Sequence, residues 1–181
     1  MAEQIFGEPL PGFTLTDLDG STVSLDSAIS GKRGAVVVFW SGVCSHCRRY
    51  DDYLNAFRKS HPDLALVVVG SRQDESVRDM REAVEARQLG FPILSDPERR
   101  VSHSWLVRQT PRAFLVDAER RLLYRGAIDN FKYPEDEAYS SYLEPAIHDF
   151  LTGREIERQE TASFGCPVES TYYDLPSPLK R

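Results

Sequence analysis

Two cysteines separated by two residues carry the clearest chemical signal in the sequence: Cys44 and Cys47 enclose Ser45 and His46. They follow an apolar, β-branched run over 35–40 and precede a helical pattern. The amino terminus of a helix stabilises a thiolate, and this acts most on the first cysteine. The second cysteine shares the apolar face of the helix, so we expect it to point inward. An exposed, activated thiol beside a sheltered one is what thiol–disulfide exchange requires, with Cys44 as nucleophile and Cys47 as resolving thiol.

Metal and haem sites are the main alternatives for a close cysteine pair. A zinc site needs two further ligands, and the remaining candidates are scattered along the chain: Cys166, His61, His103 and His148. A c-type haem site needs a histidine directly after the second cysteine, where Arg48 stands. The sequence therefore predicts no metal and no organic cofactor. Two idle buried cysteines stay open as the structural alternative.

Strands and helices alternate around the cysteine pair, which predicts an α/β fold with a mixed sheet. Continuous apolar runs indicate strands buried on both faces, and apolar residues at steps of three and four indicate helices. The expected elements are a hairpin over 13–15 and 22–25, a strand over 35–40, a helix over 47–57, a strand over 64–69, a helix over 75–89, strands over 112–116 and 122–124, and a helix over 142–151.

Local signals mark where some of these elements end. An Asp-Gly turn at 19–20 closes the hairpin. Gly90 is the expected cap of the helix before it. Ser141 and Glu144 have the spacing of a capping box at the start of the last helix.

Length and charge bound the organisation and the partners. The chain has 181 residues and a net charge of −6, which fits one domain, expected over 1–153, and excludes a general nucleic-acid partner. The rest, 154–181, reads as an extended C-terminal tail that contains Cys166. No apolar run is long enough to span a bilayer, so no membrane partner is expected. The first residues do not have the pattern of a secretory signal, and we expect a cytoplasmic protein. An exported protein trimmed of its signal is the alternative.

The segment 39–47, Phe-Trp-Ser-Gly-Val-Cys-Ser-His-Cys, resembles the active-site segment of the thioredoxin superfamily. The opening over 7–15 is similar to the N-terminal extension of its redoxin branch, which includes the alkyl-hydroperoxide-reductase and thiol-specific-antioxidant group. The resemblance runs from about 7 to 153. It implies a thioredoxin fold, a mixed central sheet flanked by helices, with an added N-terminal hairpin.

The same resemblance implies a substrate-facing surface around the cysteines. Thr110-Pro111 matches the position of the family's cis-proline loop, where Thr110 would present backbone groups to a bound peptide. Trp40 and Val43, in the segment that carries the resemblance, are expected to contact substrate as well. The implied partners are protein or small-molecule disulfides and a thiol reductant.

Departures from the family pattern sharpen the expectations. The dipeptide between the cysteines is Ser-His, and His46 can donate a hydrogen bond or a charge to the Cys44 thiolate. Stabilising the reduced form makes the disulfide more oxidising. Many relatives carry a buried acid that exchanges a proton with the inner thiol, and Val38 stands at its position here. Some relatives carry a glutamate three residues after the second cysteine, where this chain has Tyr50. A base for Cys47 is therefore not identified in the sequence.

Two other functions stay open. A peroxidase of the peroxiredoxin type is indicated by Ser41, a hydroxyl three residues before Cys44, although Val37 replaces the proline that shields such a site. A non-enzymatic sensing or binding module would carry two inert thiols. For Cys166 the alternatives are burial as a small apolar residue and a mobile third thiol that exchanges with the pair or links two chains.

Overall fold

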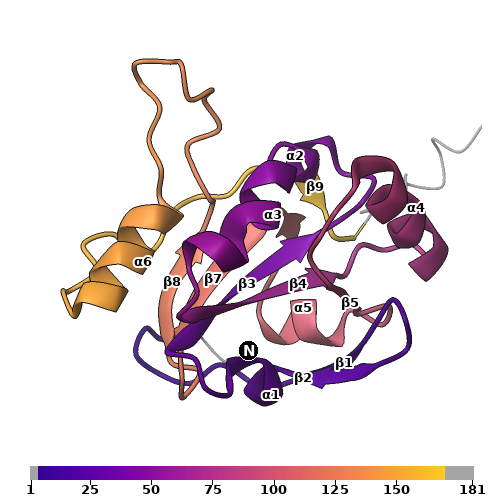
Figure 1. Cartoon of the computed structure of the whole chain (residues 1–181), viewed down its shortest axis with the longest axis horizontal. Coiled ribbons are helices and arrows are strands. Elements are labelled where there is room, and N and C mark those ends of the chain that lie inside the picture. The colour runs from indigo at the N-terminus through magenta and orange to yellow at the C-terminus, as the bar shows by residue number, and fades with distance from the viewer. Residues whose placement is uncertain (1–3, 170–181) are drawn as a thin grey trace, which may run out of the picture.

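A computed structural model describes residues 4–169 of the chain (Figure 1). In chain order its elements are β1 (Thr14–Asp17), β2 (Thr22–Ser24), α1 (Leu25–Ile29), β3 (Gly34–Trp40), α2 (Ser45–Arg48), α3 (Asp51–Ser60), β4 (Leu64–Gly70), α4 (Val77–Arg87), β5 (Ile93–Ser95), α5 (Arg100–Ser104), β6 (Gln109–Thr110), β7 (Arg112–Asp117), β8 (Leu122–Gly126), α6 (Leu143–Thr152) and β9 (Cys166–Pro167).

Seven strands form one mixed sheet in the order β2-β1-β5-β4-β3-β7-β8, and β6 pairs with β9 in a second, small sheet. Strand β3 lies inside the large sheet, parallel to β4 and antiparallel to β7. The predicted α/β fold with a mixed central sheet is confirmed. The predicted hairpin is confirmed as well, since β1 and β2 pair antiparallel and β1 joins the sheet through β5.

Strand β3 divides the core into two layers. Its residues alternate between the faces of the sheet, so Val38 packs with the apolar residues of α3 and α6, and Val37 packs with Leu25 of α1 and Trp105. Figure 1 shows α2, α3 and α6 on one face and α1 and α5 on the other. Because helices cover both faces, every residue of β3 is buried, which explains its continuous apolar sequence.

The helix predicted over 47–57 is two helices. The short α2 ends at Arg48, and α3 begins at Asp51. Tyr50 separates them, with φ −103° and ψ 10°, outside the helical region. The apolar periodicity continues across the break, because residues of both helices face the same core layer. The sequence pattern therefore gave no sign of it.

Two predicted caps are wrong. Helix α4 ends at Arg87, and its C-cap is Gln88, which adopts the left-handed conformation at φ 53°, two residues before Gly90. Helix α6 has no side-chain capping bond; Glu144 instead accepts from the hydroxyl of Tyr53 at 2.6 Å and pairs with His61 at 3.0 Å. These partners lie on and just after α3, so Glu144 ties two helices together.

The described part of the predicted tail is extended, and it belongs to the folded unit. Ile156 and Val168 are buried in the two core layers, with exposed fractions of 9% and 1%. Thr161 packs so closely on Gly126 that a Cβ there would lie 2.1 Å from its hydroxyl oxygen. The boundary predicted at 153 therefore separates segments that share one core. The last part of the predicted tail, 170–181, lies outside the described residues.

Substituting Val37 by Ala should lower the free energy of unfolding by about 2 kcal/mol, because it removes two buried methyl groups and leaves a cavity. Val37 is fully buried in the centre of β3. Val77→Ala is the matched control, since that valine is 39% exposed at the start of α4, and its effect should be within about 0.5 kcal/mol. Denaturant unfolding measures both. Equal losses would contradict the central position of β3.

Candidate functional site

The two cysteines lie where β3 leads into α2. Cys44 is the N-cap residue of α2, and Cys47 lies inside this one-turn helix with its side chain in the core. Cys47 is fully buried, and Cys44 is only 1% exposed. The expectation of an exposed nucleophile is therefore wrong for this conformation, and the contacts around Cys44 give the reason.

The loop before β7 closes over Cys44. The Thr110–Pro111 peptide bond is cis, as the resemblance implies. The Sγ of Cys44 lies 3.4 Å from the backbone carbonyl oxygen of Thr110, to which it donates when it is protonated, and both loop residues are buried. Cys166 lies against Cys44 from the other side, opposite Thr110 in the pairing of β6 with β9.

The two thiols of the pair have opposite acidities. The pKa of Cys44 is lowered from 9.0 to about 4, chiefly because the thiol of Cys47 donates a hydrogen bond to its thiolate. The thiol and the backbone N–H of Cys166 donate to the same sulfur, while burial acts in the opposite direction. Burial raises the pKa of Cys47 well above 9.0, and the neighbouring Cys44 thiolate raises it further. One sulfur is thus an anion at neutral pH and the other a proton donor.

Two residues that the sequence did not single out hold the loop before Cys44. The backbone N–H of Gly42 donates to the carboxylate of Glu75 at 2.6 Å, and its carbonyl accepts from the guanidinium of Arg87 at 2.8 Å. Arg87 also pairs with Asp51 at the start of α3. A Cβ at Gly42 would lie 2.8 Å from the side chain of Ala83, so only glycine fits here. No local pattern marks this contact between a loop and α4.

The structure places the other predicted site residues in different surroundings. Val43 is 62% exposed beside Cys44 and is available to a substrate. Trp40 is fully buried under the guanidinium of Arg87, 5.3 Å from the ring, so it has no surface to offer a substrate, which corrects the expectation. His46 is half-buried, and its ring packs against Phe131 with centroids 5.2 Å apart.

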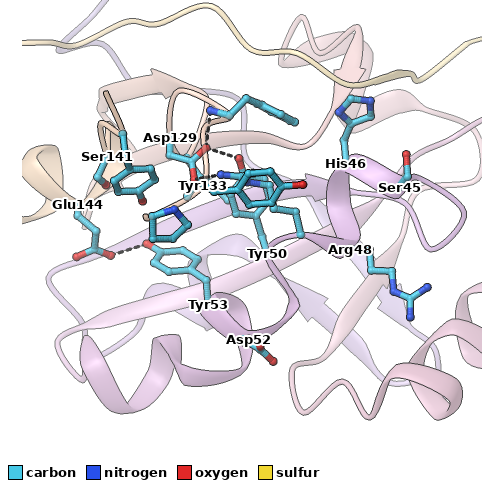
Figure 2. A pocket seen from close by; sticks show the side chains of 15 residues that line it. Ser45, His46, Arg48, Tyr50, Asp52, Tyr53, Asp129, Tyr133, Ser141 and Glu144 are labelled. Atoms are coloured by element: carbon cyan, nitrogen blue, oxygen red, sulfur yellow. Dashed lines mark hydrogen bonds and ion pairs between the residues drawn. The ribbon is translucent and has the colours of Figure 1, made fainter. Parts of the chain in front are cut away.

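An aromatic cleft opens beside the exposed side of α2 (Figure 2). It has a volume of about 890 Å³, and Ser45 and His46 form one end of it. Asp129 anchors its far wall by accepting from the hydroxyl of Tyr50 at 2.6 Å and pairing with Arg49 at 3.3 Å. The cleft therefore connects the surface next to the cysteines with the loop before α6.

Among residues 4–169, no three His, Cys, Asp or Glu side chains are grouped so that they could hold a metal ion. Over the same residues, no helix is both long and apolar enough to cross a bilayer.

Thiolate absorbance should show the low pKa of Cys44 directly. In the reduced protein, one thiolate should persist as the pH falls from about 8 to about 6 and should disappear only near pH 4. Cys44→Ser should remove this titration, and Cys47→Ala should move it upward because the main hydrogen-bond donor is lost. Because the folded pKa lies below 9.0, the unfolded chain binds more protons between these values. The free energy of unfolding, relative to Cys44→Ser, should therefore rise with pH over this window. If the wild-type protein and Cys44→Ser showed the same absorbance from pH 8 to pH 4, the assignment of the low pKa to Cys44 would be contradicted.

Glu75 should make a pH-dependent contribution of the opposite sign. Burial raises the pKa of its carboxyl group above 4.5, so the folded protein binds more protons than the unfolded chain just above that value. Relative to Glu75→Gln, which keeps an acceptor for Gly42, the wild-type protein should lose stability as the pH rises through the raised pKa. Glu75→Ala should be less stable than Glu75→Gln at every pH, because the Gly42 N–H loses its partner. Unfolding measured at several pH values tests this, and a pH-independent difference between wild type and Glu75→Gln would refute it.

The comparisons with known proteins agree with this fold. The thiol-disulfide oxidoreductase ResA of Bacillus cereus is 25% identical over 117 residues, 65% of this chain and 66% of the relative, so the match spans just under two thirds of the relative's length. A structure of an uncharacterized conserved protein from Geobacillus kaustophilus superposes with a TM-score of 0.81 at 21% identity, covering 93% of this chain and 94% of that one.

A hypothetical protein from Sinorhizobium meliloti superposes with a TM-score of 0.80 at 26% identity, over 94% of this chain and 97% of that one. Since residues 1–153 are 153 of 181, or 85%, of the chain, the shared fold extends into the C-terminal segment. The sequence model of the AhpC/TSA family matches residues 6–125, which is well over half of the chain. The chain belongs to the AhpC/TSA family.

Proposed function

We propose that the protein is a thiol–disulfide oxidoreductase in which Cys44 and Cys47 exchange with protein or small-molecule disulfides. The observation that supports this most is the asymmetry of the pair: an acidic thiol next to a buried thiol that stays protonated. An inert structural pair has no need of this difference. The name of the ResA relative, a thiol-disulfide oxidoreductase, agrees with the proposal.

The reaction follows from these two acidities. The Cys44 thiolate attacks one sulfur of a substrate disulfide, a mixed disulfide forms, and the other substrate sulfur leaves as a thiolate. Cys47 then loses its proton to solvent and attacks the Cys44 sulfur, and the second substrate sulfur leaves as a thiolate that takes up a proton. The products are a reduced substrate and a Cys44–Cys47 disulfide, which a thiol reductant returns to the dithiol.

Cys47 loses its proton most easily after the first step. Besides burial, two interactions raise the pKa of Cys47: its hydrogen bond to Cys44 and the negative charge on Cys44. Both are removed when Cys44 becomes part of the mixed disulfide. The thiolate of Cys47 is also stabilised by the Ser41 backbone and the Thr110 side chain. Because the pKa of Cys47 falls at this stage, the thiol can lose its proton without a dedicated base, although Val38 and Tyr50 stand where many relatives carry an acid.

The exposed substrate surface is proposed to include Val43 and the end of the cleft at Ser45 and His46. His46 keeps its proposed role of tuning the Cys44 thiolate by a hydrogen bond or a charge. The ring of His46 packs on Phe131, which holds it against the loop before α6. The residues that act most on Cys44 are nevertheless Cys47 and Cys166.

The reduction potential of the Cys44–Cys47 pair tests the proposal. Because the reduced form contains a stabilised thiolate, the potential should lie above the roughly −270 mV of thioredoxin, nearer the roughly −180 mV of protein disulfide isomerase. Equilibration in glutathione buffers, followed by alkylation and mass spectrometry, measures it. His46→Ala should lower the potential by about 10–30 mV, because it removes the side chain proposed to stabilise the Cys44 thiolate. A protein that forms no Cys44–Cys47 disulfide at any accessible potential would contradict the proposal.

Peroxide reduction is the second candidate, favoured by family membership and by Ser41, buried three residues before Cys44. In that reaction the Cys44 thiolate attacks the peroxide, forms a sulfenic acid and releases water or an alcohol, and Cys47 resolves the sulfenic acid as a disulfide. Measuring the turnover of hydrogen peroxide beside that of a disulfide, with the same thiol reductant, distinguishes the two. Faster turnover of peroxide would assign the protein to this second function.

A further inference from the structure

The chain's own C-terminal segment occupies the edge of the cis-proline loop. Strand β9 pairs antiparallel with β6, with Cys166 opposite Thr110 and Pro167 opposite Gln109. The pairing continues through the backbone N–H of Val168, which donates to the carbonyl of Arg108 at 2.9 Å. In Figure 1 this strand lies beside the start of α2. An extended segment with a cysteine is therefore held where the resemblance expects a substrate peptide.

Close packing fixes this segment. A Cβ at Gly165 would lie 1.8 Å from the carbonyl oxygen of Thr110 and 3.1 Å from the nitrogen of Pro111, so only glycine lets the strand approach the loop. Val168 anchors the other end of the strand, because its side chain is buried in the core layer behind the sheet. The hydroxyl of Ser163 accepts from Arg112 at 2.9 Å. The position of Cys166 is thus determined on both sides.

The three thiols of the chain form one cluster. The thiol and backbone N–H of Cys166 donate to the Cys44 sulfur, on which the thiol of Cys47 also converges. Burial raises the pKa of Cys166, and the Cys44 anion raises it further, so Cys166 remains a thiol while Cys44 is an anion. The pair itself is almost inaccessible, with Cys44 1% and Cys47 0% exposed, whereas Cys166 is partly exposed.

We propose that Cys166 is a third redox-active thiol that takes over the disulfide from the Cys44–Cys47 pair and presents it to the reductant. This inference rests on the proposed function. The Cys166 thiol loses a proton to solvent, and its thiolate attacks the Cys44 sulfur of the Cys44–Cys47 disulfide. The bond between Cys44 and Cys47 breaks, the bond between Cys44 and Cys166 forms, and Cys47 leaves as a thiolate and takes up a proton. One disulfide is lost and one is gained, so no external oxidant or reductant is consumed.

The exchange solves a problem of access. A thiol reductant has to reach a disulfide sulfur, and both sulfurs of the original pair are buried. Moving the disulfide to Cys166 brings one of its sulfurs toward the surface. Arg72 contacts Cys166 and lowers the pKa of its thiol, against the stronger effects that raise it. The reductant would attack the Cys166 sulfur, and Cys44, whose thiolate is stabilised, would leave. Arg72 would stabilise Cys166 as the attacking thiolate in the step above.

Peptide mapping distinguishes the two disulfides. Trypsin leaves Cys44 and Cys47 together in the peptide 34–48 and places Cys166 in the peptide 159–180. The full-length protein is oxidised with one equivalent of diamide, blocked with an alkylating reagent and digested without reduction. A Cys44–Cys166 disulfide joins the two peptides, whereas a Cys44–Cys47 disulfide does not. We expect the joined peptide in the wild-type protein and, as the main monomeric product, in Cys47→Ser.

Controls separate position from mere reactivity. Gly165→Ala in the Cys47→Ser background keeps both thiols but displaces the strand, and the joined peptide should form about 10–100-fold more slowly. Gly90→Ala is the matched substitution, since its Cβ would meet the nearest atom at 3.6 Å, an ordinary contact, and it should change nothing. As a single substitution that leaves Cys44 and Cys47 in place, Cys166→Ser should slow the reduction of the Cys44–Cys47 disulfide by glutathione, relative to the wild-type protein.

The outcomes separate this inference from the proposed function. If the wild-type protein forms the Cys44–Cys47 disulfide but the joined peptide is absent from wild type or from Cys47→Ser, Cys166 is not a redox partner and the proposed function stands. If Cys44 of Cys47→Ser forms only disulfides between two chains, or only a mixed disulfide with glutathione, Cys166 is likewise not a redox partner and the proposed function stands. If no Cys44–Cys47 disulfide forms, the proposed function itself fails.

Discussion

A thiolate in an almost dry position is the constraint on which the site depends. Cys44 is nearly inaccessible, and burial alone would keep its sulfur protonated. A buried charge is tolerated only when hydrogen bonds replace the water it has lost. Here the donors are the thiol of Cys47 and the thiol and backbone N–H of Cys166. The acidity of the first cysteine is therefore a property of two segments that meet, α2 and β9, in addition to the position of the residue at a helix terminus.

The scaffold explains how these donors are held in place. Strand β3 is covered on both faces, so its end cannot shift without disturbing two core layers. The loop that follows is fixed at Gly42 from both sides of one residue, by Glu75 and Arg87. Because Arg87 also binds Asp51, the loop, α3 and α4 form one rigid support. A site on rigid elements keeps its hydrogen-bond geometry through successive steps of the reaction.

The C-terminal segment changes how the site is understood. A domain that ended at 153 would leave the edge of the cis-proline loop open for a substrate strand. In the structure, Gly165 and Cys166 cover that edge, and Val168 closes the core behind it. The likeness to solved structures over more than nine tenths of the chain includes part of this segment. Residues 154–169 are thus part of the folded unit.

Residues that are neighbours in the chain carried most of what the sequence determined. The Cys44–Cys47 spacing, the buried run of β3 and the hairpin are local patterns, since periodicity and spacing report directly on nearby backbone. The cis-proline loop at Thr110-Pro111 was implied by the family resemblance. Tertiary structure alone decided the break between α2 and α3, the burial of Trp40, the contacts of Glu75 with Gly42, and the place of Cys166 beside Cys44. Except for the break between α2 and α3, these features join segments far apart in the chain. They depend on how helices and loops pack on the sheet, which leaves no periodic trace in the sequence of either partner.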